Sequence, residues 1–371
     1  MNNKVIPLDE PIVGKEEIKY LTECIESGWI SWQGKFVSQF ESDFARYCGV
    51  KYGISTCNGT AALIVALQSL GIGAGDEVIV PTFTFSASVF AINLVGATPV
   101  FADTLSDKFL VDPADVRRRI TPRTKAILVV HLYGHPCDMD PVMEIARSHD
   151  LKVVEDVAEA SGAEYRGQKV GSIGDVGCFS FHNKLIATGE GGMILTNDES
   201  VIRRAEALRT PAPDNRTEFP DISLNFRMSN LHAAVGVAQL ERFEEIIARK
   251  RRIAKYYDDA FRDRTEIQSV LEDPWARCVY WRYTIMITDN SRKSRDEIVA
   301  ELNEKGIQAR AIFFPMHLHP YYRTQTPESF PNAEALSLRG IDLPTSPKLE
   351  SDDLGEVVEA LLRAVSTSRL A

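Results

Sequence analysis

Short apolar segments alternate with amphipathic segments over about the first 240 residues, and this alternation constrains the fold more than any other feature. Strand-like runs lie at 77–80, 98–102, 124–132 and 151–155, and helical patterns lie at 15–27, 36–47, 60–70 and 141–149. The run at 124–132 is almost continuously apolar, which is typical of a strand buried on both faces. Strands that alternate with helices in this way predict a mainly parallel sheet with right-handed crossovers, that is, an α/β fold.

A second, smaller α/β unit is predicted to follow a long helix at 231–248. Its expected strands lie at 281–287 and 308–314. Ser294 and Glu297 form a capping box for a helix at 295–304, and Ser351 begins a final helix. The predicted division is therefore a large unit at 1–248 and a small C-terminal unit at 249–371.

Composition narrows the class of protein. The chain has 371 residues, is 44% hydrophobic and 25% charged, and carries a net charge of −10. These proportions are ordinary for a globular enzyme, and the acidic balance argues against nucleic-acid binding. The six cysteines are scattered and form no CxxC pair. We therefore expect reduced thiols in a cytoplasmic protein, with no disulfide framework and no metal site.

Two segments could in principle direct the chain to a membrane, but neither has the sequence that this requires. Residues 1–10 are polar and lack the apolar core of a signal peptide. Residues 78–101 are largely apolar, but Pro81 and several hydroxyl side chains interrupt them. This pattern predicts a strand, a loop, a helix and a second strand in a buried core, and we expect no membrane association.

The chemistry is concentrated around Lys184 and Asp156. Lys184 stands between an apolar stretch, 176–181, and a glycine turn, 189–192. Asp156 ends the predicted strand at 151–155, where open α/β sheets bind their ligands. Such a lysine and carboxylate fit pyridoxal phosphate (PLP): the amine attaches the cofactor, and the carboxylate keeps its ring nitrogen protonated. Glu155 faces the other side of the strand, so a structural role is expected for it.

A phosphate would need a separate cradle. Asn58-Gly59-Thr60 precedes the helix at 60–70, where a glycine permits close approach and the first helical amides point outward. The alternative is a helix start that Asn58 simply caps. Ser180 has a similar pair of interpretations, as a phosphate ligand or as a buried hydroxyl bonded to backbone. Phe85 either stacks on a cofactor ring or belongs to the core, and Asp156 alternatively caps a helix from residue 157.

A family resemblance favours the functional interpretations. Characteristic motifs occur at 29–34, 58–61, 80–85, 131–134, 155–160, 179–181, 184–192 and 224–230. With these motifs the sequence resembles, over nearly its whole length, the DegT/DnrJ/EryC1/StrS sugar aminotransferases, which are fold type I PLP enzymes. One departure lies between Phe181 and Lys184, where this chain has two residues and family members usually have three.

The resemblance implies a role for each matching residue. Lys184 would attach PLP and Asp156 would pair with its pyridine nitrogen, while Glu159 would lie near the ring hydroxyl. Phe85 would stack on the ring, and the phosphate would be held by Gly59, Thr60 and Ser180, and by Asn225 from the other subunit of a homodimer. The expected substrate contacts are Ser31, Arg227 and His317.

The resemblance also implies a reaction. We expect transfer of an amino group from glutamate to a nucleotide-linked 4-keto-6-deoxyhexose, with freed Lys184 moving the proton. The alternatives are an aminotransferase for another sugar or carbon, a PLP-dependent sugar dehydratase, and a binding protein that has lost catalysis. Dehydratases of this family replace the lysine by histidine, so Lys184 argues against the second alternative. The sequence leaves open whether the nucleotide is GDP, UDP or dTDP.

Overall fold

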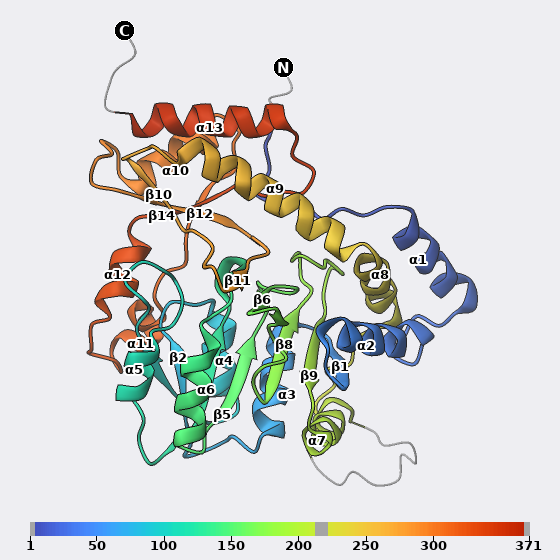
Figure 1. Ribbon diagram of the computed structural model, residues 1–371. Coiled ribbons are helices and arrows are strands. Elements are labelled where there is room, and N and C mark those ends of the chain that lie inside the picture. Colours follow the sequence, from blue (N-terminus) through green and yellow to red (C-terminus); the bar gives the residue numbers. More distant parts are fainter. Residues whose placement is uncertain (1–3, 212–221, 367–371) are drawn as a thin grey trace.

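A seven-stranded sheet forms the centre of the large unit in the computed structural model, which describes residues 4–211 and 222–366. Its strand order is β1-β9-β8-β5-β4-β2-β3 (Figure 1). The strands are β1 (Tyr52–Thr56), β9 (Gly192–Thr196), β8 (Val176–Ser180), β5 (Lys152–Asp156), β4 (Thr124–Val130), β2 (Glu77–Pro81) and β3 (Thr98–Ala102). All neighbouring pairs are parallel except those of β9, which is antiparallel to both β1 and β8. The predicted mainly parallel α/β sheet is confirmed.

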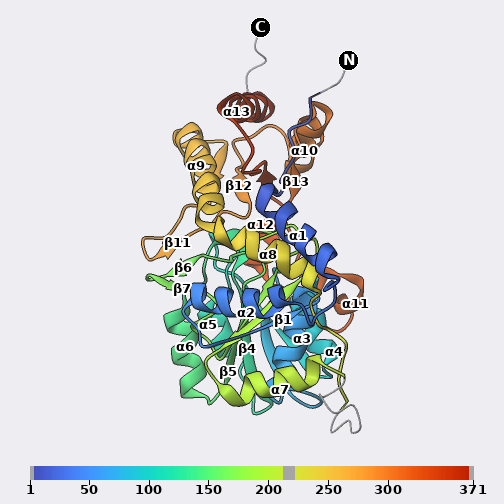
Figure 2. The ribbon, with the colours of Figure 1, turned by 90° about the vertical axis from the view of Figure 1, so that its right-hand side faces the viewer.

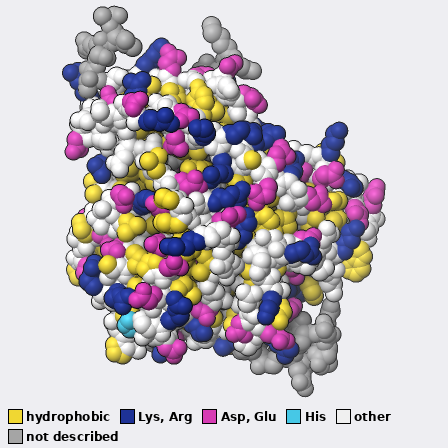
Figure 3. Space-filling view, in the orientation of Figure 1, with side chains coloured by type: hydrophobic (Ala, Val, Ile, Leu, Met, Phe, Trp, Pro, Cys, Tyr) yellow, Lys and Arg dark blue, Asp and Glu magenta, His cyan; other side chains and the backbone are white. Residues whose placement is uncertain are grey.

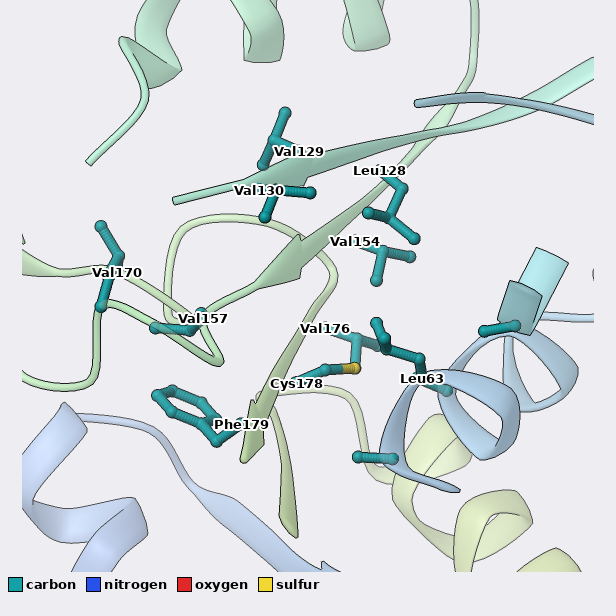
Figure 4. Packing of buried hydrophobic residues seen from close by; sticks show 14 of the residues in the cluster. Leu63, Leu128, Val129, Val130, Val154, Val157, Val170, Val176, Cys178 and Phe179 are labelled. Atoms are coloured by element: carbon teal, nitrogen blue, oxygen red, sulfur yellow. The ribbon is translucent and has the colours of Figure 1, made fainter. Parts of the chain in front are cut away.

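Helices cover both faces of this sheet, as Figure 2 shows. On one face lie α5 (Pro113–Arg118) and α6 (Met139–Ser148); on the other lie α3 (Gly59–Ser69), α4 (Ser86–Leu94) and α7 (Glu199–Arg209). Residues 61–67 of α3 are all buried. In Figure 4, Leu63 of α3 points toward Val176 and Cys178 of β8. Burial of the whole helix fixes its N-terminus against the ends of the strands.

The helices α1 (Lys15–Ser27), α2 (Lys35–Cys48) and α8 (Asn230–Glu241) pack together at the β1 edge of the sheet. Smaller elements are β6 (Glu164–Tyr165), β7 (Gln168–Lys169), β11 (Ala276–Arg277), α11 (Pro320–Arg323) and α12 (Pro331–Ser337). The helix predicted at 15–27 and the strand predicted at 98–102 are confirmed with the same bounds. Residues 78–101 form strand, loop, helix and strand, as expected.

The small unit is a four-stranded antiparallel sheet with three helices against it (Figure 1). The strand order is β10 (Ile267–Ser269), β12 (Tyr283–Ile287), β14 (Gly340–Leu343) and β13 (Arg310–Ala311). The helices are α9 (Phe243–Phe261), α10 (Arg295–Glu304) and α13 (Ser351–Val365). The capping box predicted for the helix at 295–304 is present, because Ser294 and Glu297 exchange both hydrogen bonds.

Four predicted segments were wrong in detail. The single helix expected at 231–248 is two helices, α8 and α9, because Arg242 between them has non-helical dihedrals (φ −119°, ψ 17°). The strand expected at 124–132 ends at Val130, and residues 132–134 form a 3₁₀ turn. The strands expected at 281–287 and 308–314 begin later or are much shorter, at Tyr283–Ile287 and Arg310–Ala311. Of the residues left out of these two strands, Trp281, Arg282 and Phe313 line the pocket described below.

Two hydrophobic cores divide within α9. Ile247 belongs to the core of the large unit and Ile253 to that of the small unit, on either side of the predicted boundary at 248. The cores do not follow the chain strictly, however. Ile6 joins the small core and bridges to Ile307, whereas the segment from Ile312 to Leu336 contributes to the large core.

The surface carries mixed charge. On the face in Figure 3, basic and acidic side chains of the described residues are interspersed over both units, with no continuous basic stripe. Within residues 4–211 and 222–366, no helix is long and apolar enough to cross a bilayer. The same part of the chain contains no cluster of three or more His, Cys, Asp or Glu side chains placed to hold a metal ion.

Candidate active site

A pocket of about 560 Å³ lies where the carboxyl ends of the large sheet meet the small unit. This volume suits a bound cofactor with part of a substrate. The large unit lines it with the start of α3, the ends of β5 and β8, and the loop that follows β8. The small unit contributes residues just before β12 and around β13. The charged and aromatic lining residues are Phe85, Asp156, Glu159, Phe179, His182, Lys184, Glu190, Trp281, Arg282, Arg310 and Phe313.

Lys184 projects from the loop between β8 and β9 into this pocket. Its Nζ lies 3.6 Å from Oε1 of Glu159 and 3.6 Å from the centre of the Trp281 ring. Burial lowers the pKa of Lys184, and the nearby Arg282 guanidinium lowers it further, whereas the Glu159 carboxylate raises it. A lowered pKa increases the fraction of neutral amine, which is the form that attacks a carbonyl carbon.

Asp156 ends β5 as a buried carboxylate. The Ser88 hydroxyl of α4 donates to Oδ2 at 2.7 Å, and the Ala158 amide donates to Oδ1 at 3.0 Å. Residues 158–162 form turns, so the alternative of a carboxylate capping a helix from residue 157 is excluded. Burial raises the pKa of Asp156, which means that its negative charge is only partly compensated by these two hydrogen bonds.

The N-terminus of α3 and Ser180 form a narrow cradle. A Cβ atom added to Gly59 would lie 2.6 Å from Cβ of Ser180, so only glycine leaves this space open. Asn58 caps the helix, with its Oδ1 accepting from the Ala61 amide at 2.9 Å. The cap and the cradle therefore coexist, because the amides of Gly59 and Thr60 precede the first intrahelical hydrogen bonds. Both residues line the pocket.

Glu159 and Phe85 also line the pocket. Glu159 is buried, and its Oε2 accepts from the Tyr133 amide at 3.0 Å. Phe85 precedes α4 and is 56% exposed, although it contacts Phe313 at a ring-centre distance of 5.9 Å. Phe85 is therefore not a core residue, and its exposed ring face is available to a ligand. Glu155 faces the other way, as expected, and accepts from the amides of Gly171, Ile173 and Gly174.

Four predicted site residues lie outside the pocket of their own chain. Asn225 is exposed in an extended segment, where Oδ1 accepts from the Arg227 guanidinium at 3.0 Å; the following helix is capped instead by Ser229. Arg227 also stacks on Trp32 at 4.5 Å. Ser31 is exposed near the start of α2.

His317 is buried and bonded on both ring nitrogens, to Thr82 at 2.7 Å and to Glu334 at 3.3 Å. Within this chain its contacts join residues 82, 317 and 334, and they leave no ring nitrogen facing the pocket.

The residues that are present fit PLP. The cradle at Gly59 and Ser180 offers backbone amides and a hydroxyl to a phosphate. The buried Asp156 carboxylate lacks a full counter-charge, and a protonated ring nitrogen supplies one. Lys184 carries an amine with a lowered pKa within the same pocket. These are the three groups that hold this cofactor in enzymes that use it.

Several lining residues were missed from the sequence: Ser88, Trp281, Arg282, Arg310 and Phe313. Ser88 had a signal, since it lies in the first turn of the helix that follows the motif at 80–85. The other four lie in segments that were interpreted as ordinary strands. Nothing in their spacing indicates that one of these strands would begin later and the other would be much shorter, or that these side chains would line the pocket.

A family model matches this chain. The DegT/DnrJ/EryC1/StrS aminotransferase family model covers residues 11–362. The chain belongs to this family. Its members are PLP-dependent, so the protein is a PLP-dependent nucleotide-sugar aminotransferase, and the predicted family and cofactor are confirmed.

Individual relatives agree with the family. A GDP-perosamine synthase of Caulobacter vibrioides is 44% identical over 363 residues, covering 96% of this chain and 97% of the relative. The GDP-perosamine synthase of Escherichia coli O157:H7 is 41% identical over 361 residues, covering 96% of this chain and 98% of the relative.

Among solved structures, S. venezuelae DesV has a TM-score of 0.90 and 34% identity, with 95% of each chain covered. DesI, solved with its TDP-sugar product, has a TM-score of 0.91 and 32% identity, covering 98% of this chain and 94% of DesI.

A left-handed residue precedes Lys184, in the loop that the resemblance predicts to be one residue shorter than in family members. Asn183 adopts a left-handed conformation with φ of 33°, which asparagine tolerates better than most residues. This residue reverses the chain just before Lys184, and the Lys184 side chain still reaches the pocket.

Proposed function

We propose that this enzyme transfers an amino group from glutamate to C4 of a GDP-linked 4-keto-6-deoxyhexose. The observation that carries this proposal is the similarity, at 40–44% identity over nearly the whole chain, to three GDP-perosamine synthases. The pocket supports it physically, because Lys184, Asp156 and the residues of the phosphate cradle all line it, and its volume of about 560 Å³ suits a cofactor with part of a substrate.

The large unit supplies the groups that hold and tune the cofactor. The amides of Gly59 and Thr60, with the Ser180 hydroxyl, would bind the phosphate. Asp156 would hold a proton on the ring nitrogen, and its own bonds to Ser88 and Ala158 keep its carboxylate oriented. When bound, PLP acts as an electron sink for the carbon from which a proton is removed.

Lys184 would move that proton. Once a substrate amine has displaced it, Nζ is free to accept a proton from the amino donor and return it in the sugar half of the reaction. The short distances from Nζ to Glu159 and to the Trp281 ring restrict where the freed amine can lie. The lowered pKa of Lys184 brings it nearer to the working pH, as general acid–base catalysis requires.

The test is a panel of GDP-, UDP- and dTDP-linked 4-keto-6-deoxyhexoses, each incubated with holoenzyme and glutamate, with products identified by mass. We expect the GDP sugar to be aminated with the highest kcat/KM. A preference for a dTDP sugar would overturn the nucleotide assignment, and an unaminated product that has lost water would favour the dehydratase alternative instead. The presence of Lys184, which dehydratases of the family replace by histidine, supports amination.

We further propose that two copies of the chain complete each other's sites. Asn225 lies in an extended segment whose neighbours, Leu224 and Phe226, pack against the core of their own chain. Alternation along such a segment directs the Asn225 side chain outward. Next to the pocket, α4 exposes Phe90 (44%) and Leu94 (66%), and these apolar side chains suit a subunit contact.

Complementation between two inactive variants tests the shared site. Lys184→Ala and Asn225→Ala subunits should each be nearly inactive alone, and a mixed dimer should regain activity because one of its two sites has both residues intact. A Lys184→Ala subunit mixed with an Asp156→Asn subunit is the matched control, since both changes affect the same chain's side of the site. If mixed dimers form without regaining activity, the shared site is wrong.

A further inference from the structure

The motif at 131–134 forms a turn in which two consecutive residues have unusual backbone dihedrals. Tyr133 is only 5% exposed and adopts a left-handed conformation with φ of 55°, and Gly134 follows with φ of 97°. A bulky residue such as tyrosine rarely adopts this conformation. Backbone strain of this kind persists only where the surrounding contacts fix it, and it is concentrated at functional sites. The contacts of the turn therefore indicate what the strain maintains.

The backbone of Tyr133 bonds to both units beside the pocket. Its amide donates to Oε2 of Glu159 at 3.0 Å, and its carbonyl accepts from the Arg282 amide at 3.4 Å. Glu159 belongs to the large unit and Arg282 to the small unit, and both line the pocket. One left-handed residue thus joins a carboxylate of one wall to the backbone of the other.

Gly134 brings the backbones of the two units into direct contact. Its carbonyl accepts from the Val279 amide at 2.9 Å. A Cβ atom added to Gly134 would lie 2.6 Å from the Tyr280 nitrogen and 2.8 Å from the Trp281 nitrogen, so a larger residue would push this part of the small unit away. Tyr280 is itself left-handed, with φ of 49°. Two strained turns are therefore packed against each other, and Trp281 directly follows the left-handed residue of the second.

The Tyr133 side chain supports the same tryptophan. Its ring lies nearly parallel to the Trp281 ring, with ring centres 6.4 Å apart and an angle of 10° between the planes. The tyrosine ring also stacks on Phe313 at 5.4 Å, and its hydroxyl accepts from the Phe313 amide at 3.1 Å. Burial raises the pKa of Tyr133, so this hydroxyl stays protonated near neutral pH. Two aromatic residues of the small-unit wall therefore pack on one tyrosine of the large unit.

Two of the residues that Tyr133 contacts, Glu159 and Trp281, are also neighbours of the Lys184 amine. As described above, Nζ lies 3.6 Å from Oε1 of Glu159 and 3.6 Å from the centre of the Trp281 ring. Tyr133 fixes the first through its amide and the second through its ring. Movement of the tyrosine would therefore displace both neighbours of Nζ together.

Exclusion of water matters most for the charge state of this amine. Burial lowers the pKa of Lys184 more than any charged group does. The guanidiniums of Arg282 and Arg310 lower it further, and the carboxylates of Glu159 and Asp156 oppose them by raising it. Because the two pairs act in opposite directions, admitting water to Nζ should raise the pKa, even though the indole no longer attracts the charged amine.

We propose that Tyr133 is a positioning residue for Lys184: it holds the Glu159 carboxylate and the Trp281 indole against Nζ. Together with Gly134, it couples this arrangement to the contact between the two units. The inference rests on the proposed function in taking Lys184 as the residue that attaches PLP. If the small unit shifts away from the turn, the indole leaves Nζ and water enters. Docking of the small unit thus sets the reactivity of the lysine.

Two glycine variants separate displacement of the small unit from backbone strain alone. Gly134→Ala places a Cβ against the backbone of residues 280–281, whereas the Cβ in Gly167→Ala meets no atom within 4 Å. Both glycines are left-handed, with φ of 97° and 81°, so both alanines carry the same kind of strain. The titration midpoint of Lys184 in each apoenzyme is measured by competitive acetylation across pH and mass spectrometry. We expect Gly134→Ala to move the midpoint up by about one pH unit and Gly167→Ala to leave it unchanged.

Side-chain variants test the ring of Tyr133 directly. Tyr133→Leu removes the stacked ring, so the midpoint of Lys184 should rise as in Gly134→Ala, whereas Tyr133→Phe keeps the ring and should change it by less than about 0.3 pH unit. Tyr165→Leu is the matched control and should leave the midpoint unchanged. Tyr165 is also buried and contacts Trp275 at a ring-centre distance of 5.1 Å, but neither residue is among those that line the pocket.

A double variant tests whether the tyrosine acts through the tryptophan. If it does, Tyr133→Leu should change the midpoint of Lys184 much less in a Trp281→Leu background than in wild type. Two independent changes would instead add.

The outcomes are distinct. An unchanged Lys184 midpoint in folded Gly134→Ala overturns the inference, as does an equal rise in Gly167→Ala or full additivity in the double variant. Circular dichroism shows which variants fold, and Gly134→Ala and Tyr133→Leu each decide the question if the other does not. Covalent attachment of PLP to the Lys184→Ala apoenzyme would instead contradict the proposed function, whatever the midpoints are.

Discussion

The two walls of the pocket differ in how far the protein satisfies their polar groups. On the large-unit wall, Asp156 and Glu159 accept hydrogen bonds from fixed partners at the ends of the sheet. On the small-unit wall, Arg282 Nε and Trp281 Nε1 are buried without partners among the described residues. A wall that holds a permanent cofactor is best fixed in advance, whereas a wall that receives exchanging substrates must keep donors open.

The comparison predicts that changes on the large-unit wall affect chemistry and those on the small-unit wall affect substrate affinity. The most severe test is Lys184→Ala. We expect turnover and covalent attachment of PLP to be abolished while the fold persists, because no other amine in the described lining replaces Nζ. Absorbance spectra with added PLP, ketosugar amination and circular dichroism check this. Amination by the Lys184→Ala variant at a rate near that of wild type would show that Lys184 does not attach the cofactor.

Asp156→Asn should have the next largest effect. Without the negative charge the ring nitrogen is no longer held protonated, and kcat should fall on the order of 100-fold while PLP still binds. Steady-state rates and equilibrium dialysis of PLP separate the two effects. Comparable losses of rate and of PLP affinity would mean that Asp156 mainly holds the cofactor.

Asp156→Asn should lower the rate, but it should not lower the stability of the apoprotein. The folded-state pKa of Asp156 is raised above its ordinary value of 3.8, so the charged carboxylate costs stability at neutral pH. Apoprotein carrying Asp156→Asn should melt at the same temperature as wild type or on the order of 1–2 °C higher at pH 7. The difference should disappear as the pH falls below 3.8, where this carboxyl is protonated in both the folded and the unfolded wild-type protein.

Gly59→Ala tests the part of the large-unit wall that would bind the phosphate of PLP. The new Cβ would lie 2.6 Å from Ser180 Cβ, so the cradle must widen, and PLP affinity should fall roughly tenfold with a smaller loss of kcat at saturating PLP. Gly73→Ala is a matched control, because its Cβ would meet no atom closer than 3.7 Å. Equal PLP affinity in both variants would argue against the cradle.

The smallest expected effect is a shift in pH dependence. Glu159 lies 3.6 Å from Lys184 and raises its pKa, so Glu159→Gln should lower that pKa by roughly one unit. The midpoint pH at which apoenzyme gains reactivity toward PLP should move down correspondingly, while exposed Glu206→Gln leaves it unchanged. A shift to higher pH would show that Glu159 does not act as a carboxylate near Nζ.

The difference between the two walls also explains which site residues can be predicted from the sequence and which cannot. Gly59, Asp156 and Ser180 occupy short motifs at strand ends, where a parallel sheet brings them together without reference to the rest of the chain. Arg282 directly precedes β12, and Arg310 begins the two-residue strand β13, both in the other unit. Arg282 bonds Asp9, which also bonds Lys250, 241 residues away from it in the chain. Local patterns carry no information on such contacts.

The reversed direction of β9 has a consequence for evolution of the loop that carries Lys184. Because β8 and β9 are antiparallel neighbours, this loop is the end of a hairpin, and Phe181 closes it by bonding both Gly191 and Thr188. Only residues 182–187 lie in the loop that the hydrogen bond between Phe181 and Thr188 closes. An insertion or deletion there changes the path of this loop and leaves every strand in register, so the segment before the lysine can change in length without disturbing the sheet.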